Sequence, residues 1–584
     1  MREVIFGSPD TQAKGLHLRF TAPVTTYSAK RLEEVVPLLR AAEAAATSGA
    51  WVALMLSYEA APAFDDALKT HAPGFLPLAW AAVFDKPAAP AAPATIVDEL
   101  TAGSYKLTAW KSQVSGSEYS EAVRHIRDLI AKGDTYQVNY TFPLQSHFNG
   151  DASAWYDTLC AAQGAEYCAY LDLGRYKVLC VSPELFFERR GDSIKTKPMK
   201  GTINRGRWAL EDDGLAQQLA ASPKDRAENV MIVDLLRNDL GKISVPGSVR
   251  VSKLFEVERY ETLWQMTSTV ESTLGSDVGL ADVMAALFPC GSITGAPKIR
   301  TMEIIRELEP FPRGIYTGTI GFMRPGCDCV FNVAIRTVVL DTVSRAATFG
   351  VGGGITTDST AEREYDECLL KSSFLNAPVV SFRLFESILL EQGEFFLLSR
   401  HIERLRASAK YFGFRFREEE ILCVLERVAR TCSNARWKIR LLLANDGEID
   451  TDAVHLSAPD RGTLPVALAT EPVNSSQKFL FHKTTNRLIY TRALGKRPDC
   501  YDVILWNERG EITESTIANV VISIDGQLYT PPQESGLLAG TFREELLAVG
   551  TIRERVILRE ELRMAASFFL VNSVHKWIPV ILTA

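Results

Sequence analysis

The sequence alternates helical patterns with short apolar strands in two successive series, and this order restricts the chain to mixed α/β folds. In the first series, SEYSEAVRHIRDLIAKGD (117–134) has the spacing of an amphipathic helix, whereas YKVLCVSPELFFER and AATFGVGGGI have the apolar runs of strands leading into turns. The first series ends near residue 376, and a new strand pair is expected around Glu391-Gln392-Gly393. The pattern therefore predicts two α/β units.

The chain has 584 residues, which is long for one hydrophobic core and favours about two to four folding units. We expect a first domain over residues 1–376, a linker over 377–383 and a second domain over 384–584. An Ala/Pro stretch, KPAAPAAPAT (86–95), has no hydrophobic periodicity and is typical of a surface connector. No internal repeat is visible.

Composition and charge argue against two classes of partner. The net charge is −7 and no Lys/Arg run is present, so we expect no nucleic-acid partner. No apolar stretch reaches the roughly 18 residues that span a bilayer, and the N-terminus has no long apolar signal region, so we expect no membrane contact and a cytoplasmic location. The ten cysteines have no paired spacing typical of a disulfide framework, which favours reduced thiols.

Two pairs of carboxylates have helical i, i+3 spacing: Asp225 with Glu228, and Glu364 with Glu367. On a helix, both members of such a pair project from one face. Four acids gathered in one cleft would repel each other unless a cation lay among them, and oxygen ligands without a nearby His or Cys cluster favour Mg²⁺ over zinc. The pattern predicts a magnesium site that handles an anionic substrate, although a solvated helix face would show the same spacing.

Two further residues could act on a substrate. Lys200 lies between Pro198 and Gly201, in a stretch suited to presenting a side chain into a cavity, and a desolvated lysine there could be a nucleophile. Glu184 follows a Ser-Pro at a strand edge, and a partly buried carboxyl with a raised pKa could protonate a leaving hydroxyl. The alternative for Lys200 is an ordinary exposed lysine.

Several loops carry groups that could hold carboxylates. The loop FPCGSITGAPK enters a helix at Pro297, where free backbone N–H groups would attract an anion, and an arginine fork can grip a carboxylate. Glycines in GVGGG let backbone amides approach closely. The candidate substrate-binding residues are Thr202, Thr294, Gly295, Lys298, Tyr316, Arg336, Gly352, Gly353 and Gly354. Each loop could also be a structural turn.

The second series contains the parts of a pyridoxal phosphate (PLP) site. Such a site needs a lysine that binds the cofactor, an acid against the pyridine nitrogen and phosphate holders. Lys483 and Glu514 could supply the first two, while Gly540 and Thr541 at a helix start, together with Arg404, could hold the phosphate. Lys483 could instead be exposed, and Arg404 could form an ordinary ion pair on a helix.

Residues from about 115 to 372 resemble the chorismate-utilising enzymes, because eight motifs stand in the family's order: GDTYQVN, SPELFF, KPMKGT, DRAENVMIVDLLRNDLG, GSITGAPK, YTGTIGF, NVAIRT and GGGI…EREYDE. The resemblance implies the family's fold of antiparallel sheets flanked by helices. It also implies that chorismate is the substrate and that Mg²⁺ is held by Glu228 and Glu367, with Asp225 and Glu364 in the surrounding shell.

Within that family, the residue before Gly-Thr separates members that make anthranilate from members that make 4-amino-4-deoxychorismate, and Lys200 is typical of the latter. The resemblance implies that Lys200 attacks C2 of chorismate while Glu184 helps the C4 hydroxyl to leave. The chain departs from the family at Gln265, where members that aromatise the ring commonly have a histidine. No Gly-x-Cys-x-Gly nucleophile elbow of a glutaminase is found, so we expect a separate glutamine amidotransferase subunit to supply ammonia.

Residues 384–575 resemble the fold-type IV pyridoxal enzymes through FESILL, HIERL, HKTTNR, TESTIANV and GLLAGTFREE. The resemblance implies two α/β subdomains, PLP bound through Lys483, and homodimerisation as a possibility. It also implies that the hydroxyl of Ser387 assists proton transfer. Together, the two halves predict a bifunctional enzyme that makes 4-aminobenzoate for folate synthesis. The alternatives are an anthranilate synthase-like component joined to an aminotransferase, or to a C-terminal domain without activity.

Overall fold

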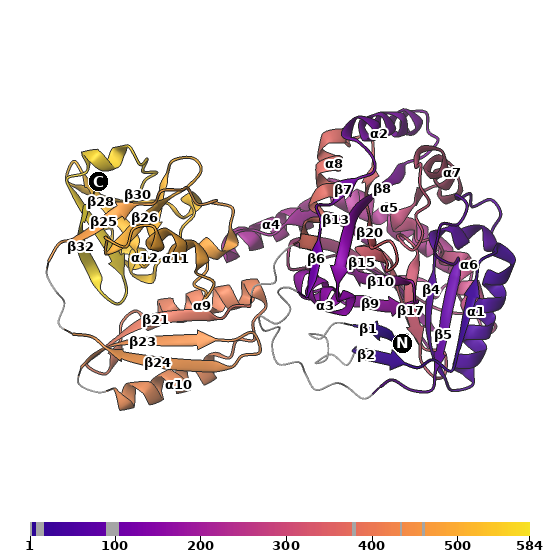
Figure 1. Ribbon diagram of the computed structural model, residues 1–584, viewed down its shortest axis with the longest axis horizontal. Coiled ribbons are helices and arrows are strands. Elements are labelled where there is room, and N and C mark those ends of the chain that lie inside the picture. Colours follow the sequence, from indigo (N-terminus) through magenta and orange to yellow (C-terminus); the bar gives the residue numbers. More distant parts are fainter. Residues whose placement is uncertain are drawn as a thin grey trace. The chain divides into compact units, whose positions relative to one another are not determined.

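The computed structural model describes residues 3–7, 17–88, 104–376, 381–432, 435–457 and 462–583. The chain divides into two compact units (Figure 1). Unit 1 consists of Met1–Asn204 and Ala216–Val379, and unit 2 consists of Arg205–Leu215 and Val380–Ala584. Most of the expected linker, residues 377–380, and most of the Ala/Pro stretch, residues 89–95, lie outside the described residues.

Unit 1 contains two ten-stranded sheets, and every strand pairing in them is antiparallel. The first sheet has the order β16 (Gly295–Ala296), β8 (Gln137–Gly150), β20 (Ala346–Ile355), β19 (Thr337–Asp341), β10 (Tyr176–Ser182), β9 (Tyr167–Asp172), β1 (Glu3–Phe6), β2 (Leu18–Thr21), with β6 (Tyr105–Leu107) and β7 (Lys111–Ser112) paired to β8. The second has the order β13 (Met199–Asn204), β15 (Leu263–Thr273), β12 (Ser193–Lys197), β11 (Leu185–Arg190), β18 (Cys329–Val333), β17 (Thr319–Met323), β4 (Trp51–Leu56), β5 (Ala79–Phe84), β3 (Thr25–Ala29), with β14 (Arg250–Arg259) paired to β15.

The two sheets pack face to face, with helices on both outer faces. The rings of Phe6 on β1 and Phe322 on β17 lie 5.0 Å apart in the layer between the sheets. Side chains alternate along a strand, so Ala53 of β4 points into this inner layer while Leu54 packs outward. The outer face of the second sheet packs against α1 (Leu32–Thr47), α5 (Pro223–Gly241) and α6 (Leu280–Leu287), and that of the first against α2 (Gly116–Ala131), α3 (Ala152–Gln163), α7 (Lys298–Leu308) and α8 (Ala361–Leu370).

Unit 2 has two α/β parts. A four-stranded antiparallel sheet has the order β22 (Glu394–Phe395), β21 (Leu384–Glu391), β23 (Arg436–Leu443), β24 (Ile449–His455) and packs on α9 (Leu398–Phe412) and α10 (Glu418–Thr431). An eight-stranded mixed sheet has the order β27 (Ile512–Ser515), β26 (Asp502–Trp506), β25 (Leu464–Leu468), β32 (Lys576–Leu582), β31 (Ser567–Asn572), β28 (Asn519–Ile524), β29 (Gln527–Thr530), β30 (Arg553–Glu554). Helices α11 (Leu488–Gly495) and α12 (Thr541–Ala548) pack on this sheet.

The remaining helices are α4 (Ala209–Ala221) and the short 3₁₀ segments η2 (Tyr58–Ala63), η3 (Gly291–Ile293), η4 (Ser373–Asn376), η5 (Lys478–Leu480), η6 (Gln533–Ser535) and η7 (Glu561–Met564). Within the described ranges, every helix is too short or too polar to cross a bilayer.

The predicted mixed α/β fold class is confirmed. The predicted helix over 117–134 corresponds to α2, which Ser115 and Glu118 begin with a reciprocal capping box. The predicted strand pair is the hairpin of β21 and β22, where Gln392 and Gly393 have positive φ values of 53° and 82°. One detail differs from the expectation: Gly350–Gly354 lie inside strand β20 rather than in a turn after it.

Candidate active sites

Unit 1 contains a cavity of about 860 Å³ lined by residues of β13, β20, α5 and α8. A volume of this size suits a small-molecule site. Most of the predicted residues of the first domain lie together on its wall: Glu184, Lys200, Thr202, Asp225, Glu228, Tyr316, Arg336, Gly352, Gly353, Gly354, Glu364 and Glu367. The strand that carries Lys200 thus faces the two helices that carry the carboxylates.

Lys200 and Glu184 have perturbed pKa values that suit a nucleophile and an acid. Burial lowers the pKa of Lys200, against the opposing charges of Glu228 and Glu184. Burial raises the pKa of Glu184 to about 7, against a hydrogen bond from Ser292 and the charge of Lys200. The Ser292 hydroxyl donates to Oε1 of Glu184 over 2.6 Å. Around neutral pH, these shifts favour a larger neutral fraction of the lysine and a protonated fraction of the carboxyl.

The raised pKa of Glu184 leads to a prediction for the pH dependence of a Glu184→Gln variant. In the native chain, activity of the first site should fall as pH rises through about 7, because the Glu184 carboxyl loses its proton there. Glutamine cannot donate that proton, so we expect the rate to drop by about 100- to 10,000-fold and the descending limb to disappear. A pH–rate profile of chorismate consumption tests this, and a variant that keeps the native limb would contradict the acid role.

The four carboxylates occupy two helices as their spacing predicts. Asp225 and Glu228 lie on α5, which begins at the N-cap Ser222 with Pro223 in its first turn, and Glu364 and Glu367 lie on α8. Burial raises the pKa of Glu228, and the nearby acids Asp225 and Glu364 add to this. Such mutual repulsion is what a bound cation relieves.

Lysines neutralise part of this cluster. The Nζ of Lys371 lies 2.9 Å from Glu367 Oε1, and that of Lys224 lies 4.0 Å from Glu228 Oε1. Burial acts to raise the pKa of Glu367, but the charge and hydrogen bond of Lys371, together with the charges of Lys200 and Lys224, lower the pKa overall. Among the described residues, no three His, Cys, Asp or Glu side chains are already grouped as metal ligands. Carboxylate oxygens are the ligands that a hard cation such as Mg²⁺ prefers, so the residue types fit such an ion. To bind it, Glu228 and Glu367 would have to reorient away from their lysine partners.

Arg336 is a partly buried guanidinium on the cavity wall, without an acidic partner in the described part of the chain. It donates to Oε1 of Gln163, and burial lowers its pKa to about 10. The Arg336 backbone has a positive φ of 50°, which is uncommon for a residue with a side chain. A substrate carboxylate would supply the missing counter-charge through a bidentate pair.

We expect Arg336→Lys to raise the KM for chorismate at least about 30-fold, because a point charge does not replace a guanidinium fork and the partner carboxylate is left poorly paired. Steady-state kinetics with varied chorismate measure this. Arg345→Lys, in the turn between β19 and β20, is the matched control, and equal KM values for both variants would refute the assignment.

Gln265 holds the strand that carries Lys200. Its Nε2 donates to the Gly201 carbonyl over 2.9 Å, and its Oε1 accepts from the Thr202 hydroxyl over 3.0 Å. Both ends of the amide are therefore bonded to β13. Because an amide does not titrate near neutral pH, Gln265 positions the strand and cannot carry protons.

Three of the predicted residues lie away from the cavity wall. Lys298 donates to Asp239 over 2.9 Å and to the Leu287 carbonyl over 3.3 Å. Thr294 is fully buried and bonds the Cys290 carbonyl, and Gly295 pairs with Val138 in the sheet. The GSITGAPK loop therefore contributes Ser292 and Ile293 to the wall, and its lysine holds the helices together.

The sequence did not single out Gln137, which lies near Lys200, or Ser292, which contacts Glu184. A Cβ on Gly354 would lie 2.1 Å from Gln137 Nε2 and 3.1 Å from Lys200 Nζ. Gln137 is 1% exposed, and neither polar atom of its side chain has a hydrogen-bond partner among the described residues. Ser292 belongs to a loop that the sequence marked, but only the fold brings it to Glu184.

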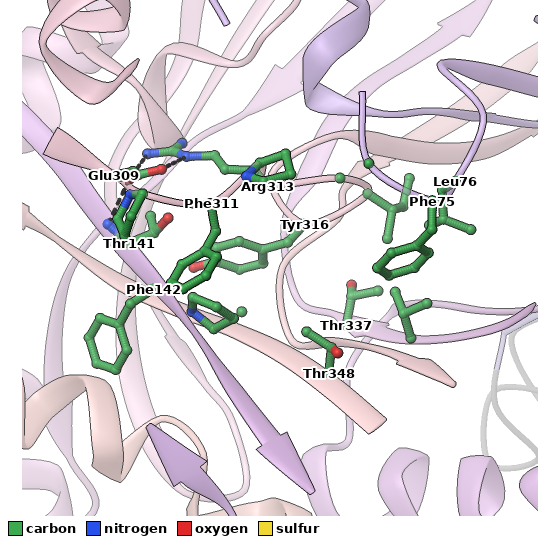
Figure 2. A pocket seen from close by; sticks show the side chains of 18 residues that line it. Phe75, Leu76, Thr141, Phe142, Glu309, Phe311, Arg313, Tyr316, Thr337 and Thr348 are labelled. Carbon is green, nitrogen blue, oxygen red and sulfur yellow. Dashed lines mark hydrogen bonds and ion pairs between the residues drawn. The ribbon is translucent and has the colours of Figure 1, made fainter. Parts of the chain in front are cut away.

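A second cavity, of about 80 Å³, lies on another side of Tyr316 (Figure 2). Apolar side chains including Phe75, Leu76, Phe142 and Phe311 line it, and the buried pair Glu309–Arg313 closes one end with a contact of 2.6 Å. Tyr316 and Gly350 belong to the walls of both cavities, and a Cβ on Gly350 would lie 2.3 Å from the tyrosine ring. The larger cavity, which contains Lys200, Glu184 and the two pairs of carboxylates, is the better candidate for catalysis.

In unit 2, Lys483 and Glu514 lie close enough to influence each other's charge. Burial, and then the positive charge of Arg404, lower the pKa of Lys483 to about 7. Burial raises the pKa of Glu514 to about 7, against a hydrogen bond from the Tyr490 hydroxyl of 2.8 Å. The Lys483 ammonium lies 4.8 Å from the centre of the Phe385 ring. Side chains alternate along β21, so Ser387 is on the same face as Phe385.

The predicted phosphate holders lie near one another. Gly540 precedes α12, and Thr541 is its first residue. Arg404 donates to the Ala539 carbonyl, directly before this helix start, over 3.1 Å. Its other nitrogens bind Glu386 at 2.5 and 2.9 Å, so an internal carboxylate already neutralises this arginine. A basic lysine, a buried acid and a helix N-terminus beside an arginine fit the requirements of PLP.

Known families match both parts of the sequence. Residues 2–377 match the model of the chorismate binding enzyme family, and residues 383–582 match that of amino-transferase class IV. Aminodeoxychorismate synthase component 1 of Bacillus subtilis is 41% identical over 254 residues, 44% of this chain and 54% of that protein. The same component of Salmonella typhimurium is 40% identical over 277 residues, 47% of this chain and 60% of that protein. The chain thus spans little more than half the length of these relatives.

Solved structures share the fold of unit 1. Anthranilate synthase component I from Streptococcus pneumoniae has a TM-score of 0.54 at 24% identity, covering 64% of this chain and 92% of that chain. The menaquinone-specific isochorismate synthase of Escherichia coli has a TM-score of 0.50 at 17% identity, covering 64% and 88%. Residues 383–582 are similar to the amino-transferase class IV family, and the chain belongs to the chorismate binding enzyme family.

Proposed function

We propose that the chain is a bifunctional enzyme that converts chorismate and ammonia to 4-amino-4-deoxychorismate and then to 4-aminobenzoate and pyruvate. The observation that carries the proposal is the position of Lys200 in the larger cavity beside Glu184. A lysine there separates this chain from anthranilate producers, which present a small residue at that position. The relatives named aminodeoxychorismate synthase component 1 support the same reading.

In the first reaction, the neutral Nζ of Lys200 bonds to C2 of the ring, both ring double bonds shift, and the C4 hydroxyl leaves as water with the proton of Glu184. Ammonia then bonds to C4, both double bonds return and Lys200 is released from C2, while the proton released from the added ammonia returns to Glu184. Arg336 pairs with a substrate carboxylate and aligns the ring for both attacks.

Magnesium would be held by Glu228 and Glu367, with Asp225 and Glu364 orienting these ligands. It would supply positive charge next to a ring carboxylate and so reduce the repulsion between the substrate and the acidic wall. A Glu367→Gln variant with weakened Mg²⁺ affinity but a normal circular dichroism spectrum would support this assignment.

In the second reaction, the ring amine of 4-amino-4-deoxychorismate enters unit 2, where bound PLP supplies an electron sink. Lys483, with its lowered pKa, takes the proton from C4. Glu514 would hold the pyridine nitrogen, the α12 start and Arg404 would hold the phosphate, and the Ser387 hydroxyl would assist proton transfer. As the C4 proton is removed, the C3–O bond breaks and the ring becomes aromatic, which makes the step favourable. The released enolpyruvate takes up a proton and becomes pyruvate.

To test the proposal, the purified chain is incubated with chorismate, Mg²⁺ and an ammonium salt, once with PLP and once without it. We expect 4-amino-4-deoxychorismate to accumulate without PLP, and 4-aminobenzoate and pyruvate to form in equal amounts with it. Anthranilate as the product would favour the alternative of an anthranilate synthase joined to an aminotransferase. Accumulation of the intermediate in both conditions would favour a C-terminal domain without activity.

Ammonia is proposed to come from a glutamine amidotransferase subunit. The sequence lacks a recognisable glutaminase elbow, so glutamine alone should not support turnover, whereas an ammonium salt should. Robust turnover with glutamine and no second protein would refute this part of the proposal.

A further inference from the structure

Eleven residues in the middle of the unit 1 sequence, Arg205–Leu215, belong to unit 2. We call this segment the clasp. It begins directly after β13, which carries Lys200, and the chain returns to unit 1 at Ala216 within α4. Helix α5, which carries Asp225 and Glu228, begins shortly afterwards at Pro223. The clasp therefore separates the nucleophile from the first pair of carboxylates.

A buried ion pair fixes the shape of the clasp. Arg205 and Asp212 have side chains that are 6% and 4% exposed, and they form a two-point contact with distances of 2.7 Å. Asp212 Oδ1 also accepts the backbone N–H of Gly206 over 2.8 Å. A Cβ on Gly206 would lie 2.3 Å from the Asp212 nitrogen, so the turn requires glycine. The ion pair stabilises the folded shape of the clasp, because breaking it would leave each partner as a buried, uncompensated charge.

The clasp binds the rest of unit 2 first through Tyr411 of α9. The tyrosine hydroxyl donates to the Gly206 carbonyl over 2.7 Å, and Arg205 Nη2 donates to the Tyr411 carbonyl over 2.8 Å. The Arg205 guanidinium also lies 4.5 Å from the centre of the Tyr411 ring. A second anchor is Trp208, whose ring is 5.1 Å from that of Phe481.

The third anchor is His482, the residue before Lys483. Burial lowers the pKa of His482 to about 3, so the ring is neutral and carries one N–H. A carbonyl only accepts, so Nε2–H donates to the Arg207 carbonyl over 3.2 Å, and Nδ1 accepts from the Ser408 hydroxyl over 2.9 Å. The clasp thus completes the hydrogen bonding of the residue that precedes the cofactor lysine.

We propose that the clasp is a positioning element for both active sites. When PLP orders the region around Lys483, the clasp transmits this order to the strand that carries Lys200 and to the helix that carries Glu228. The residues of the clasp touch neither substrate nor cofactor and act through His482 at one end and through β13 and α5 at the other. Coupling of this kind is reciprocal, so chorismate should also tighten PLP binding. The inference rests on the part of the proposed function that places PLP at Lys483, and the visible absorption band of bound PLP checks that part separately. The kinetic test also rests on the proposed amination, whereas the exchange test does not.

The structural test is hydrogen exchange of the full chain with and without PLP. In the native chain, PLP should slow amide exchange in 199–204 and 223–228, far from the cofactor lysine in the sequence. Tyr411→Phe removes only the hydroxyl that holds Gly206, and Trp208→Ala removes the ring on Phe481. Both should abolish the slowing while leaving the circular dichroism spectrum unchanged, whereas the control Tyr501→Phe should retain it. No slowing in the native chain would overturn the proposal.

The kinetic test is the KM for chorismate measured by ammonium-dependent amination. We expect PLP to lower this KM at least about 5-fold in the native chain, the lower end of typical coupling, and less than about 2-fold in Tyr411→Phe. Equal KM values with and without PLP in the native chain would contradict the proposal. If PLP slows exchange but no amination occurs, the proposed function is refuted and the positioning role of the clasp is supported. If amination occurs but PLP neither slows exchange nor lowers the KM, only the positioning role of the clasp is refuted.

Discussion

Lys200→Ala is expected to lower formation of 4-amino-4-deoxychorismate at least about 1,000-fold, because removing the group that forms the covalent bond costs orders of magnitude in rate. The side chain also fills the part of the cavity beside Gly354. Without it, ammonia can reach C2, so residual turnover should shift towards the ortho product, anthranilate. Chromatography of the products from chorismate and ammonium measures both effects.

The matched control is Lys195→Ala, in β12, the strand before β13. The Nζ of Lys195 pairs with Glu188 at the surface. This variant should keep the native rate and product. If Lys200→Ala also kept both, Lys200 would not be the nucleophile, and the distinction from anthranilate producers would lose its chemical basis.

Lys483→Ala is the second change with a large expected effect. The variant should aminate chorismate normally but release pyruvate at least about 1,000-fold more slowly, because the group that binds the cofactor and moves the C4 proton is gone. It should also lose the visible absorption band that PLP has when attached to a lysine. Separate assays of amination and pyruvate release, together with a spectrum, check the result.

Lys496→Ala, at the end of α11, is the control for this experiment, since its Nζ pairs with Glu471 at the surface. It should bind PLP and release pyruvate as the native chain does. A native chain that binds no PLP would show instead that unit 2 lacks the proposed chemistry, and a Lys483→Ala variant that still releases pyruvate would assign the proton transfer elsewhere.

Features that depend on local periodicity were predictable from the sequence. The acidic pairs lie on α5 and α8 because i, i+3 spacing places both members on one helix face whatever packs around them. The capped helix α2 and the hairpin after Glu391 follow from equally local signals. The order of the motifs predicted the fold of unit 1. Residues from motifs that are far apart in the sequence lie together on the wall of one cavity.

Features that depend on distant partners were not predictable. Lys298 looked like an anion holder at a helix start, but Asp239, on another helix, takes its charge. Arg404 likewise binds Glu386 of β21, a partner that no local sequence pattern identifies. The clasp has no signature at all, because its membership of unit 2 follows from burial of Arg205 against Tyr411, which lies 206 residues later.

The position of nitrogen in the final product tests the central claim most directly. The chain, with Mg²⁺ and PLP, is incubated with chorismate and ¹⁵N-labelled ammonium, and the aromatic product is identified by nuclear magnetic resonance. The account predicts 4-aminobenzoate with the label para to the carboxylate, together with one pyruvate for each ring. Label ortho to the carboxylate in the native chain would contradict it, because ammonia would then have entered at the carbon that Lys200 is proposed to occupy.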